Sequence, residues 1–176
     1  MKNKMVKYPL ILGTIALVAG LLLALVYNVT APIIAENKVK RENAIVIEMF
    51  GNDAKIEDIS DTLTEVETKE GIYSVLKVTD GSKKYYVYKV TFADAYDGDK
   101  SSYVLTLTSA GKIHDLTFTA AGDSYASGYA SEDYSDDIKG KGSLSINADK
   151  VSGATATGKS FVASANAAIK HQGGIK

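Results

Sequence analysis

The feature that most constrains the fold of this chain is an uninterrupted apolar run near its amino terminus. Residues 9–29 read PLILGTIALVAGLLLALVYNV and contain no charged side chain. About 20 apolar residues is the length that an α-helix needs to cross the hydrocarbon core of a bilayer. Lys2, Lys4 and Lys7 precede the run, and basic residues beside a span favour the cytoplasmic side. The sequence therefore predicts one transmembrane helix over 9–29, with residues 1–8 in the cytoplasm and the remainder outside.

A cleaved secretory signal is the alternative to a retained anchor, since it also combines a basic start with an apolar segment. Signal cores are shorter than this run, and Val29-Thr30-Ala31 is only a partial match to a cleavage site. Lys38, Lys40 and Arg41 lie on the far side of the run and partly offset the orientation signal. We expect a single-pass protein of the cell membrane that keeps its anchor.

The residues after the anchor are numerous enough for one domain of ordinary size. Pro32 predicts a break or kink, and residues 30–50 favour a juxtamembrane helix or stalk. A weak helical pattern follows at 56–63. Residues 51–172 are expected to form the extracytoplasmic domain, and residues 173–176 a flexible tail.

Four segments rich in β-branched residues and tyrosine predict four strands in successive hairpins. They are IYSVLKVTD (72–80), KKYYVYKVTFAD (83–94), SYVLTLTS (102–109) and KIHDLTFTA (112–120), separated by turn formers such as Asp80-Gly81 and Ala110-Gly111. With helices before and after them, the predicted fold class is α+β: one amino-terminal transmembrane helix followed by a single domain with an antiparallel sheet flanked by helices.

A run of small and hydroxyl residues, DKVSGATATG, occupies positions 149–158. The apolar spacing of the residues after it predicts a helix that begins near Thr157, with Phe161, Val162, Ala165 and Ile169 on one face. The first backbone N–H groups of a helix have no partner within it and, together with the helix dipole, can hold a phosphate. Gly153 and Ala154 allow close approach of a bulky anion, and Thr155 lies beside it. The alternative is that Thr155 or Thr157 only caps the helix, the commoner use of such residues.

The run from Asp149 to Thr155 resembles the flavinylation motif of the FMN-binding domain family. The matching positions are Asp149, Ser152, Gly153, Ala154 and Thr155. The resemblance implies that Thr155 is joined to FMN through a phosphoester bond, made by a separate flavin transferase that uses FAD and magnesium and releases AMP. It also implies that the transferase recognises Asp149. The phosphate site is then shaped by Ser152, Gly153 and Ala154, with Thr157 as a further candidate.

The anchor region, TIALVAGLLLALVYNVTAPIIAENK, is similar to the amino-terminal region of the G subunit of the Rnf complex. It is also similar to that of the related C subunit of sodium-pumping NADH:quinone oxidoreductase. Both are single-span proteins whose outer domain carries threonine-linked FMN. The resemblance implies an electron-transfer subunit of a membrane complex that oxidises ferredoxin, reduces NAD and moves sodium or protons. Its implied partners are the other membrane and iron–sulfur subunits, and the chain alone would perform only an internal electron step.

Two other functions fit the same residues. A stand-alone, membrane-anchored flavinylated carrier for extracellular electron transfer keeps the FMN but needs no complex. Neighbouring genes distinguish it, because a complex requires membrane and iron–sulfur partners encoded nearby. A non-redox anchored surface module is the third function, in which the SGAT run serves only as a helix cap.

The loop that contacts flavin in the FMN-binding family, often Glu-Thr-Pro-Gly, is altered in this chain. The comparable segment reads TFTAAGDSYASG, where Ala120, Ala121 and Gly122 stand in for most of the loop and neither Glu nor Pro is present. The way in which the flavin ring is held, and hence its potential, must therefore differ from the family pattern.

The segment GDSYASGYASEDYSDD, residues 122–137, is polar and is expected to be a solvated, mobile loop. The alternative is that one of its tyrosines, Tyr125, Tyr129 or Tyr134, stacks on the flavin ring. His114 is expected to be an ordinary surface residue rather than a proton donor to reduced flavin.

Composition excludes several other classes of function. The chain has no cysteine, which excludes disulfides, thiolate metal sites, cysteine-held iron–sulfur clusters and a lipid-modified amino terminus. Beyond the anchor acidic residues outnumber basic ones, so nucleic acid is not an expected partner. The sequence has no spacing typical of a metal site or of paired catalytic carboxylates, and it has no phosphate-binding GxxxxGK loop.

Overall fold

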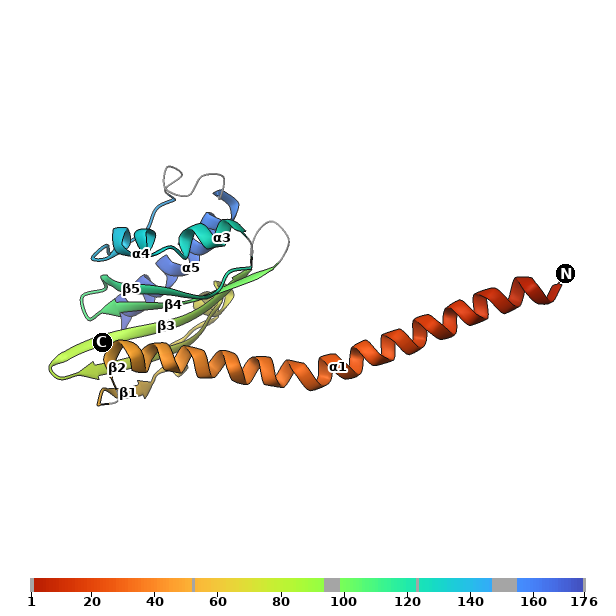
Figure 1. Cartoon of the computed structure of the whole chain (residues 1–176). Coiled ribbons are helices and arrows are strands. Elements are labelled where there is room, and N and C mark those ends of the chain that lie inside the picture. Colours follow the sequence, from red (N-terminus) through yellow and green to blue (C-terminus); the bar gives the residue numbers. More distant parts are fainter. Residues whose placement is uncertain (1, 52, 94–98, 123, 147–154, 176) are drawn as a thin grey trace. The chain divides into compact units, whose positions relative to one another are not determined.

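The computed structural model describes residues 2–51, 53–93, 99–122, 124–146 and 155–175. The elements in chain order are α1 (Lys2–Phe50), β1 (Lys55–Asp58), the 3-10 helix η1 (Ser60–Thr62), α2 (Glu65–Lys69), β2 (Ile72–Asp80), β3 (Lys83–Ala93), β4 (Lys100–Thr108), β5 (Ile113–Ala120), α3 (Ser124–Tyr129), α4 (Glu132–Ile138) and α5 (Thr155–Gly174) (Figure 1). The chain divides into two compact units, Met1–Arg41 and Glu42–Lys176.

The first unit contains the apolar part of α1. A stretch of 24 residues, Lys7–Thr30, is long and apolar enough to cross a membrane, and the predicted span 9–29 lies inside it. Its large side chains are exposed, for example Leu23 at 72%. The hydroxyl of Thr30 donates to the carbonyl of Val26 at 2.8 Å, so this polar group is satisfied within the helix. A helix that is apolar on all sides is consistent with a single-pass membrane anchor.

Helix α1 continues without a break as far as Phe50, so a break at Pro32 is wrong, while the alternative of a kink there stays a prediction. A proline removes one backbone donor from a helix, and the hydrogen bonds before and after it are enough to carry the helix through. The predicted stalk, residues 30–50, is therefore the second half of α1. Its last turns, from Glu42 onward, belong to the second unit.

The second unit is built on one five-stranded sheet in the order β1-β2-β3-β4-β5, with every neighbouring pair antiparallel. The four predicted strands are confirmed to within two residues at their ends. Strand β1 was not expected, because the weak helical pattern at 56–63 falls on β1 and η1. Pairing of Lys55–Asp58 with the edge of β2 supplies backbone hydrogen bonds that a local sequence pattern does not reveal.

Alternation along the strands divides the interior into two clusters, one on each face of the sheet. The larger cluster lies on the face covered by α5 and contains aliphatic residues such as Leu105 and Ile113. It also contains a group of packed rings, called here the aromatic cluster: Phe92, Tyr103, Phe118, Tyr129, Tyr134 and Phe161. The aliphatic cluster consists of Val46, Leu76, Val78, Val87 and Val104 and lies on the face covered by the end of α1. Figure 1 shows α5 on one side of the sheet and the last turns of α1 on the other. The α+β class and the flanking helices are confirmed.

The polar segment 122–137 forms two short helices, α3 and α4, so the expectation of a solvated loop is wrong. The hydroxyl of Ser131 caps α4 by accepting the Tyr134 backbone N–H at 3.3 Å. Tyr129 and Tyr134 are buried, with 2% and 5% exposure. Burial of these two rings stabilises an ordered segment despite its polar composition. The sequence did carry one signal for α4, since a serine followed by two acidic residues is typical of a helix start.

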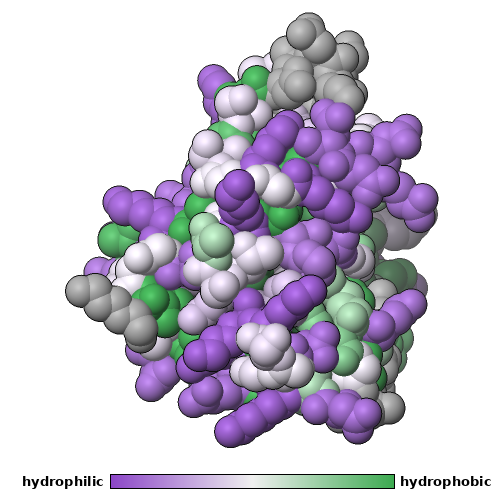
Figure 2. Space-filling model, turned by 90° about the vertical axis from the view of Figure 1, so that its left-hand side faces the viewer, coloured by the Kyte–Doolittle hydropathy of each residue, from purple (hydrophilic) through white to green (hydrophobic). Residues whose placement is uncertain are grey.

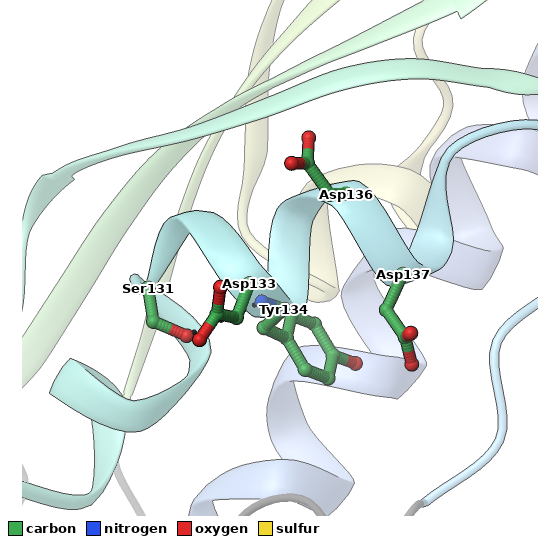
Figure 3. Close-up of a pocket in the computed structure, with 5 residues that line it drawn as sticks. All are labelled: Ser131, Asp133, Tyr134, Asp136 and Asp137. Atoms are coloured by element: carbon green, nitrogen blue, oxygen red, sulfur yellow. Dashed lines mark hydrogen bonds between the residues drawn. The ribbon is translucent and has the colours of Figure 1, made fainter.

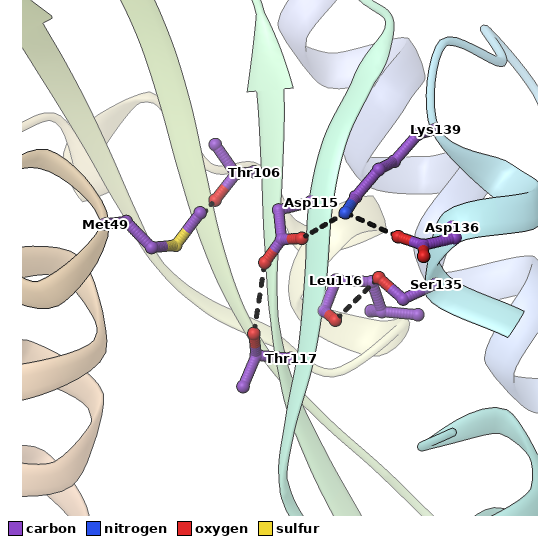
Figure 4. A network of polar contacts seen from close by, with 8 residues as sticks. All are labelled: Met49, Thr106, Asp115, Leu116, Thr117, Ser135, Asp136 and Lys139. Carbon is purple, nitrogen blue, oxygen red and sulfur yellow. Dashed lines mark hydrogen bonds and ion pairs between the residues drawn. The ribbon is translucent and has the colours of Figure 1, made fainter. Parts of the chain in front are cut away.

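Polar contacts fasten α4 to the edge strand β5 (Figure 4). The Ser135 hydroxyl donates to the Leu116 carbonyl at 3.1 Å. The ammonium of Lys139 lies 2.7 Å from the Asp136 carboxylate and 3.4 Å from that of Asp115. The hydrogen bond to Asp136 raises the pKa of Lys139 above its usual value. These exposed ion pairs contribute little stability by themselves, so the buried rings do most to hold α4 in place.

Candidate functional site

Thr155 is the first residue of α5, and its side chain is exposed. The helix therefore begins two residues before the predicted start at Thr157. The other matched residues of the motif, Asp149, Ser152, Gly153 and Ala154, lie outside the described residues. The Thr155 hydroxyl is accessible beside the first backbone N–H groups of α5, which have no acceptor within the helix. This is a position from which a threonine can carry a bulky anionic group.

Thr157 occupies a different environment from Thr155. Its exposure is 1%, and it lies inside the first turn of α5 rather than ahead of it. Thr157 is therefore not the residue that precedes the helix, and its hydroxyl is not open to a large ligand. The two threonines are only two residues apart in the sequence, but Thr155 is exposed to solvent and Thr157 is buried.

The first turns of α5 pack closely on α3 through Gly158. A Cβ atom at Gly158 would lie 2.1 Å from the Tyr129 hydroxyl oxygen, which is far inside van der Waals contact. Tyr129 also packs on Phe161 of α5, with ring centroids 5.2 Å apart. Glycine at this position lets the first turns of α5 approach the tyrosine of α3 closely.

A pocket of about 560 Å³ lies along α5 one turn beyond Thr155. Its wall on α5 is made by Lys159, Ser160 and Ala163, and the opposite wall comes from the end of α2 with Lys69, the end of β3 and the start of β4 with Lys100. Residues four apart on a helix are neighbours on one side of it. Thr155 is therefore on the side of α5 that carries Lys159 and faces the pocket.

The end of α2 is held against the sheet at Gly71. This glycine has φ of +87°, and a Cβ atom there would lie 2.0 Å from the Thr91 carbonyl oxygen. The Thr91 N–H donates to the Gly71 carbonyl at 2.9 Å. Two backbones therefore meet directly at the base of the pocket, and no other residue fits at this position.

Helix α2 begins with a capping box at Thr64. The Thr64 hydroxyl accepts the Val66 N–H at 3.3 Å, and the Thr64 N–H donates to the Glu67 carboxylate at 2.9 Å. The side-chain hydrogen bond from Thr64 lowers the pKa of Glu67 below its ordinary value. This cap fixes a helix of five residues well enough to present Lys69 beside α5.

The segment 120–122 lies at the same end of the sheet as the start of β4. The Gly122 N–H donates to the Ser101 hydroxyl at 2.9 Å, and Ser102 pairs with Ala120. Ala120, Ala121 and Gly122 therefore lie near the start of β4, where Lys100 lines the pocket.

Two of the three tyrosines proposed to stack on a flavin are core residues. The rings of Tyr129 and Tyr134 are 5.1 Å apart and perpendicular, and Tyr134 also packs edge-on against Phe161 at 6.0 Å. Burial raises the pKa of Tyr134 to about 12. Only Tyr125, at 36% exposure, presents its ring to solvent, so the stacking alternative rests on this residue alone.

His114 is exposed at the start of β5, at the opposite end of the strand from Ala120. Its ring lies 4.8 Å from that of Tyr85. The expectation of a surface residue is confirmed. His171, for which no role was predicted, links α5 to β3 and η1. Its Nδ1 lies 3.0 Å from the Tyr88 hydroxyl, and its Nε2 lies 3.1 Å from the Thr62 carbonyl.

An acidic pocket on α4 is lined by Ser131, Asp133, Tyr134, Asp136 and Asp137 (Figure 3). Its carboxylates do not converge, because Asp136 and Asp137 point to opposite sides of the helix. Throughout the part of the chain that the structure describes, no group of three or more His, Cys, Asp or Glu residues could hold a metal ion. The face in Figure 2 is mainly hydrophilic, with hydrophobic residues in small separate patches.

Comparison with known families bears on the first part of the chain. A comparison of the chain with curated proteins found no match. Residues 1–48 match the family described as the RnfG N-terminal region, a range that covers the apolar stretch Lys7–Thr30 and nearly all of α1. The match suggests a subunit of an Rnf complex and a role in electron transport. Over residues 1–48 this chain resembles the RnfG subunit.

Proposed function

We propose that this protein is the electron-transfer subunit of an Rnf-type ferredoxin:NAD oxidoreductase complex and that it carries FMN covalently on Thr155. The observation that carries the proposal is the match of residues 1–48 to the RnfG N-terminal region. At the other end of the chain, Thr155 ends the SGAT run and is the exposed first residue of α5. These two features are more than 100 residues apart and support the same function independently.

The residues near Thr155 are compatible with a phosphoester. Attachment joins the Thr155 oxygen to the FMN phosphorus of FAD and breaks the bond to AMP, which leaves, while the hydroxyl proton passes to solvent. The ester keeps one negative charge on its phosphate oxygens, to which the first N–H groups of α5 can donate hydrogen bonds. Bound FMN takes two electrons and releases them singly, and the protein supplies its placement.

The proposed topology puts residues 1–8 in the cytoplasm, 9–29 in the membrane and the domain 51–172 outside. A tether on the outer side prevents loss of the cofactor and holds it at a high effective concentration near its partners. Those partners are the other membrane and iron–sulfur subunits of the complex, together with the flavin transferase during maturation. Electron flow through the complex would drive sodium or proton movement.

Attachment is tested by expressing the full chain together with a flavin transferase and examining a denaturing gel for flavin fluorescence. Wild type and Thr157→Val should be fluorescent and Thr155→Val dark. Both variants should show the same circular dichroism as wild type, because one site is exposed and the other loses only a hydroxyl. Mass spectrometry should place the added FMN on the peptide that contains Thr155, and an unmodified wild-type peptide would overturn the proposal.

Membership in a complex is tested separately by affinity purification of the tagged chain from membranes of its own host. Iron–sulfur and membrane subunits should copurify with wild type and with Thr155→Val, since the anchor is unchanged in the variant. A chain that is flavinylated but purifies alone would instead be a stand-alone carrier.

A further inference from the structure

The pocket beside α5 is strongly basic for a domain in which acidic residues predominate. Among the described residues that line it are three lysines, Lys69, Lys100 and Lys159, and one carboxylate, Glu70. They come from three elements that are distant in the sequence, α2, β4 and α5. A cleft lined by charges of one sign attracts ligands of the opposite sign. The ligand suited to this pocket therefore carries negative charge.

The pocket has the size and wall chemistry of a ligand site. Its volume of about 560 Å³ is within the range of roughly 300–1,000 Å³ usual for small-molecule pockets. Phe92, Ala93 and Ala163 are the apolar residues among those that line it. Apolar surface together with a few charged groups suits a flat aromatic ring that bears a partial or full charge.

The position of Thr155 places an attached group within reach of this pocket. Lys159 is one turn further along the same side of α5, which is about 6 Å along the helix axis. The ribityl chain between the phosphate and the ring of FMN can cover such a span. Lys159 is then beside the phosphoester end, and Lys69 and Lys100 are on the opposite wall.

We propose that this pocket receives the isoalloxazine ring of FMN attached to Thr155, and that Lys69, Lys100 and Lys159 favour the reduced ring over the oxidised one. The inference rests on the proposed attachment at Thr155. Reduction adds two electrons, taken singly from a one-electron donor protein, and one proton from solvent, so one negative charge appears on the ring. Positive charges beside the ring stabilise that product and raise the midpoint potential.

The proposal also accounts for the altered loop at Ala120, Ala121 and Gly122. This chain lacks the glutamate and proline with which the FMN-binding family contacts flavin, and the altered segment is held to β4 through Ser101. Lys100 is the residue before that serine and lines the pocket. Contacts to the ring are therefore supplied by lysines around the pocket rather than by an acidic loop.

The first test is a potentiometric titration of the flavinylated full chain in detergent. The variant with Lys69→Gln, Lys100→Gln and Lys159→Gln should favour the reduced flavin at least tenfold less than wild type. For a two-electron couple this corresponds to a midpoint about 30 mV more negative. The matched control Lys84→Gln removes one exposed charge at the far end of β3 and should leave the midpoint unchanged. The difference should shrink at high salt, because exposed charges are screened.

The second test measures how accessible the ring is to a neutral fluorescence quencher, acrylamide. Ala163 is exposed and lines the pocket, so Ala163→Phe should fill it without disturbing the core. Quenching of the attached flavin should increase at least twofold in Ala163→Phe. It should not change in Lys170→Phe, which alters an exposed residue of the same helix outside this pocket.

The outcomes separate this inference from the proposed function. A flavinylated chain whose midpoint is the same in wild type and in the triple variant would overturn the lysine proposal and leave the attachment intact. Equal quenching in wild type and Ala163→Phe would show that the ring lies elsewhere. A denatured wild-type chain without fluorescence would remove both proposals at once.

Discussion

The two faces of the sheet are packed with different kinds of side chain. On the face covered by α5, Phe161 is fully buried and its ring lies between 5.2 and 6.2 Å from five other aromatic rings. On the face covered by α1, short aliphatic residues surround Val46. Large rings that each contact several neighbours contribute more buried area than valines do. The helix that carries Thr155 therefore rests on the more strongly packed side of the sheet, and the last turns of α1 rest on the less strongly packed side.

The largest expected effect follows from removing the centre of the aromatic cluster. Phe161→Ala should lower the free energy of unfolding by about 3–5 kcal/mol, because it deletes a buried ring and leaves a cavity. Denaturant unfolding of the full chain in detergent, followed by circular dichroism, measures the change. A loss below 1 kcal/mol would contradict the distinction between the two faces.

A smaller loss is expected from Gly158→Ala, which places a methyl group 2.1 Å from the Tyr129 hydroxyl oxygen. Overpacking of this kind costs about 1–3 kcal/mol. Tyr129→Phe removes the oxygen that the methyl meets, so the double variant should lose less than the sum of the two single variants. Simple addition of the two losses would indicate that the contact is not tight. The measurement is a double-mutant cycle by denaturant unfolding.

On the aliphatic face, Val46→Ala should cost about 1–2 kcal/mol, the transfer free energy of the lost carbons. The decrease in the free energy of unfolding is expected to be less than half of that caused by Phe161→Ala. Detergent-solubilised full chain serves for both measurements, with Ile47→Ala, exposed at 43% on the same helix, as the control. Comparable losses for Val46→Ala and Phe161→Ala would show that the two faces are equally important.

The smallest expected effect is a change in stability at alkaline pH that comes from ionisation of Tyr134. Burial raises the pKa of Tyr134 from 10.0 to about 12, so the unfolded chain loses this proton at lower pH than the folded one. Its contribution to stability is fully present below about pH 10 and is lost as the pH rises towards 12. Tyr134→Phe should therefore make the decline of stability above pH 10 shallower. Parallel declines in wild type and variant, measured by unfolding at stepped pH, would contradict this.

The sequence predicted the elements whose pattern is local. The four strands predicted from β-branched residues and tyrosine, and the apolar run predicted from its length, lie where the sequence placed them. It failed at Pro32, where neighbouring hydrogen bonds carry the helix on, and at β1, which depends on pairing with β2. The continuity of α1 and the formation of β1 both depend on hydrogen bonds and strand pairing outside a short local stretch of sequence.

The candidate site was predictable only in part. Thr155 is identified by a contiguous sequence motif. Its exposure to solvent depends on its position as the first residue of α5, which the motif does not predict. The lysines of the pocket gave no signal, since Lys69, Lys100 and Lys159 are separated by tens of residues and only the fold gathers them. The composition of 122–137 was misleading, because two tyrosines buried against Phe161 outweigh its many polar residues.

The contact at Gly71 determines what can vary around the pocket. Since the Gly71 and Thr91 peptide groups touch without an intervening side chain, this part of the pocket wall is made of main chain, which side-chain substitutions leave in place. The lysines around it keep their rotatable stems. A bound aromatic ring would thus meet a wall of main chain and a set of adjustable charges, so evolution can retune its electronics by surface substitutions without rebuilding the scaffold.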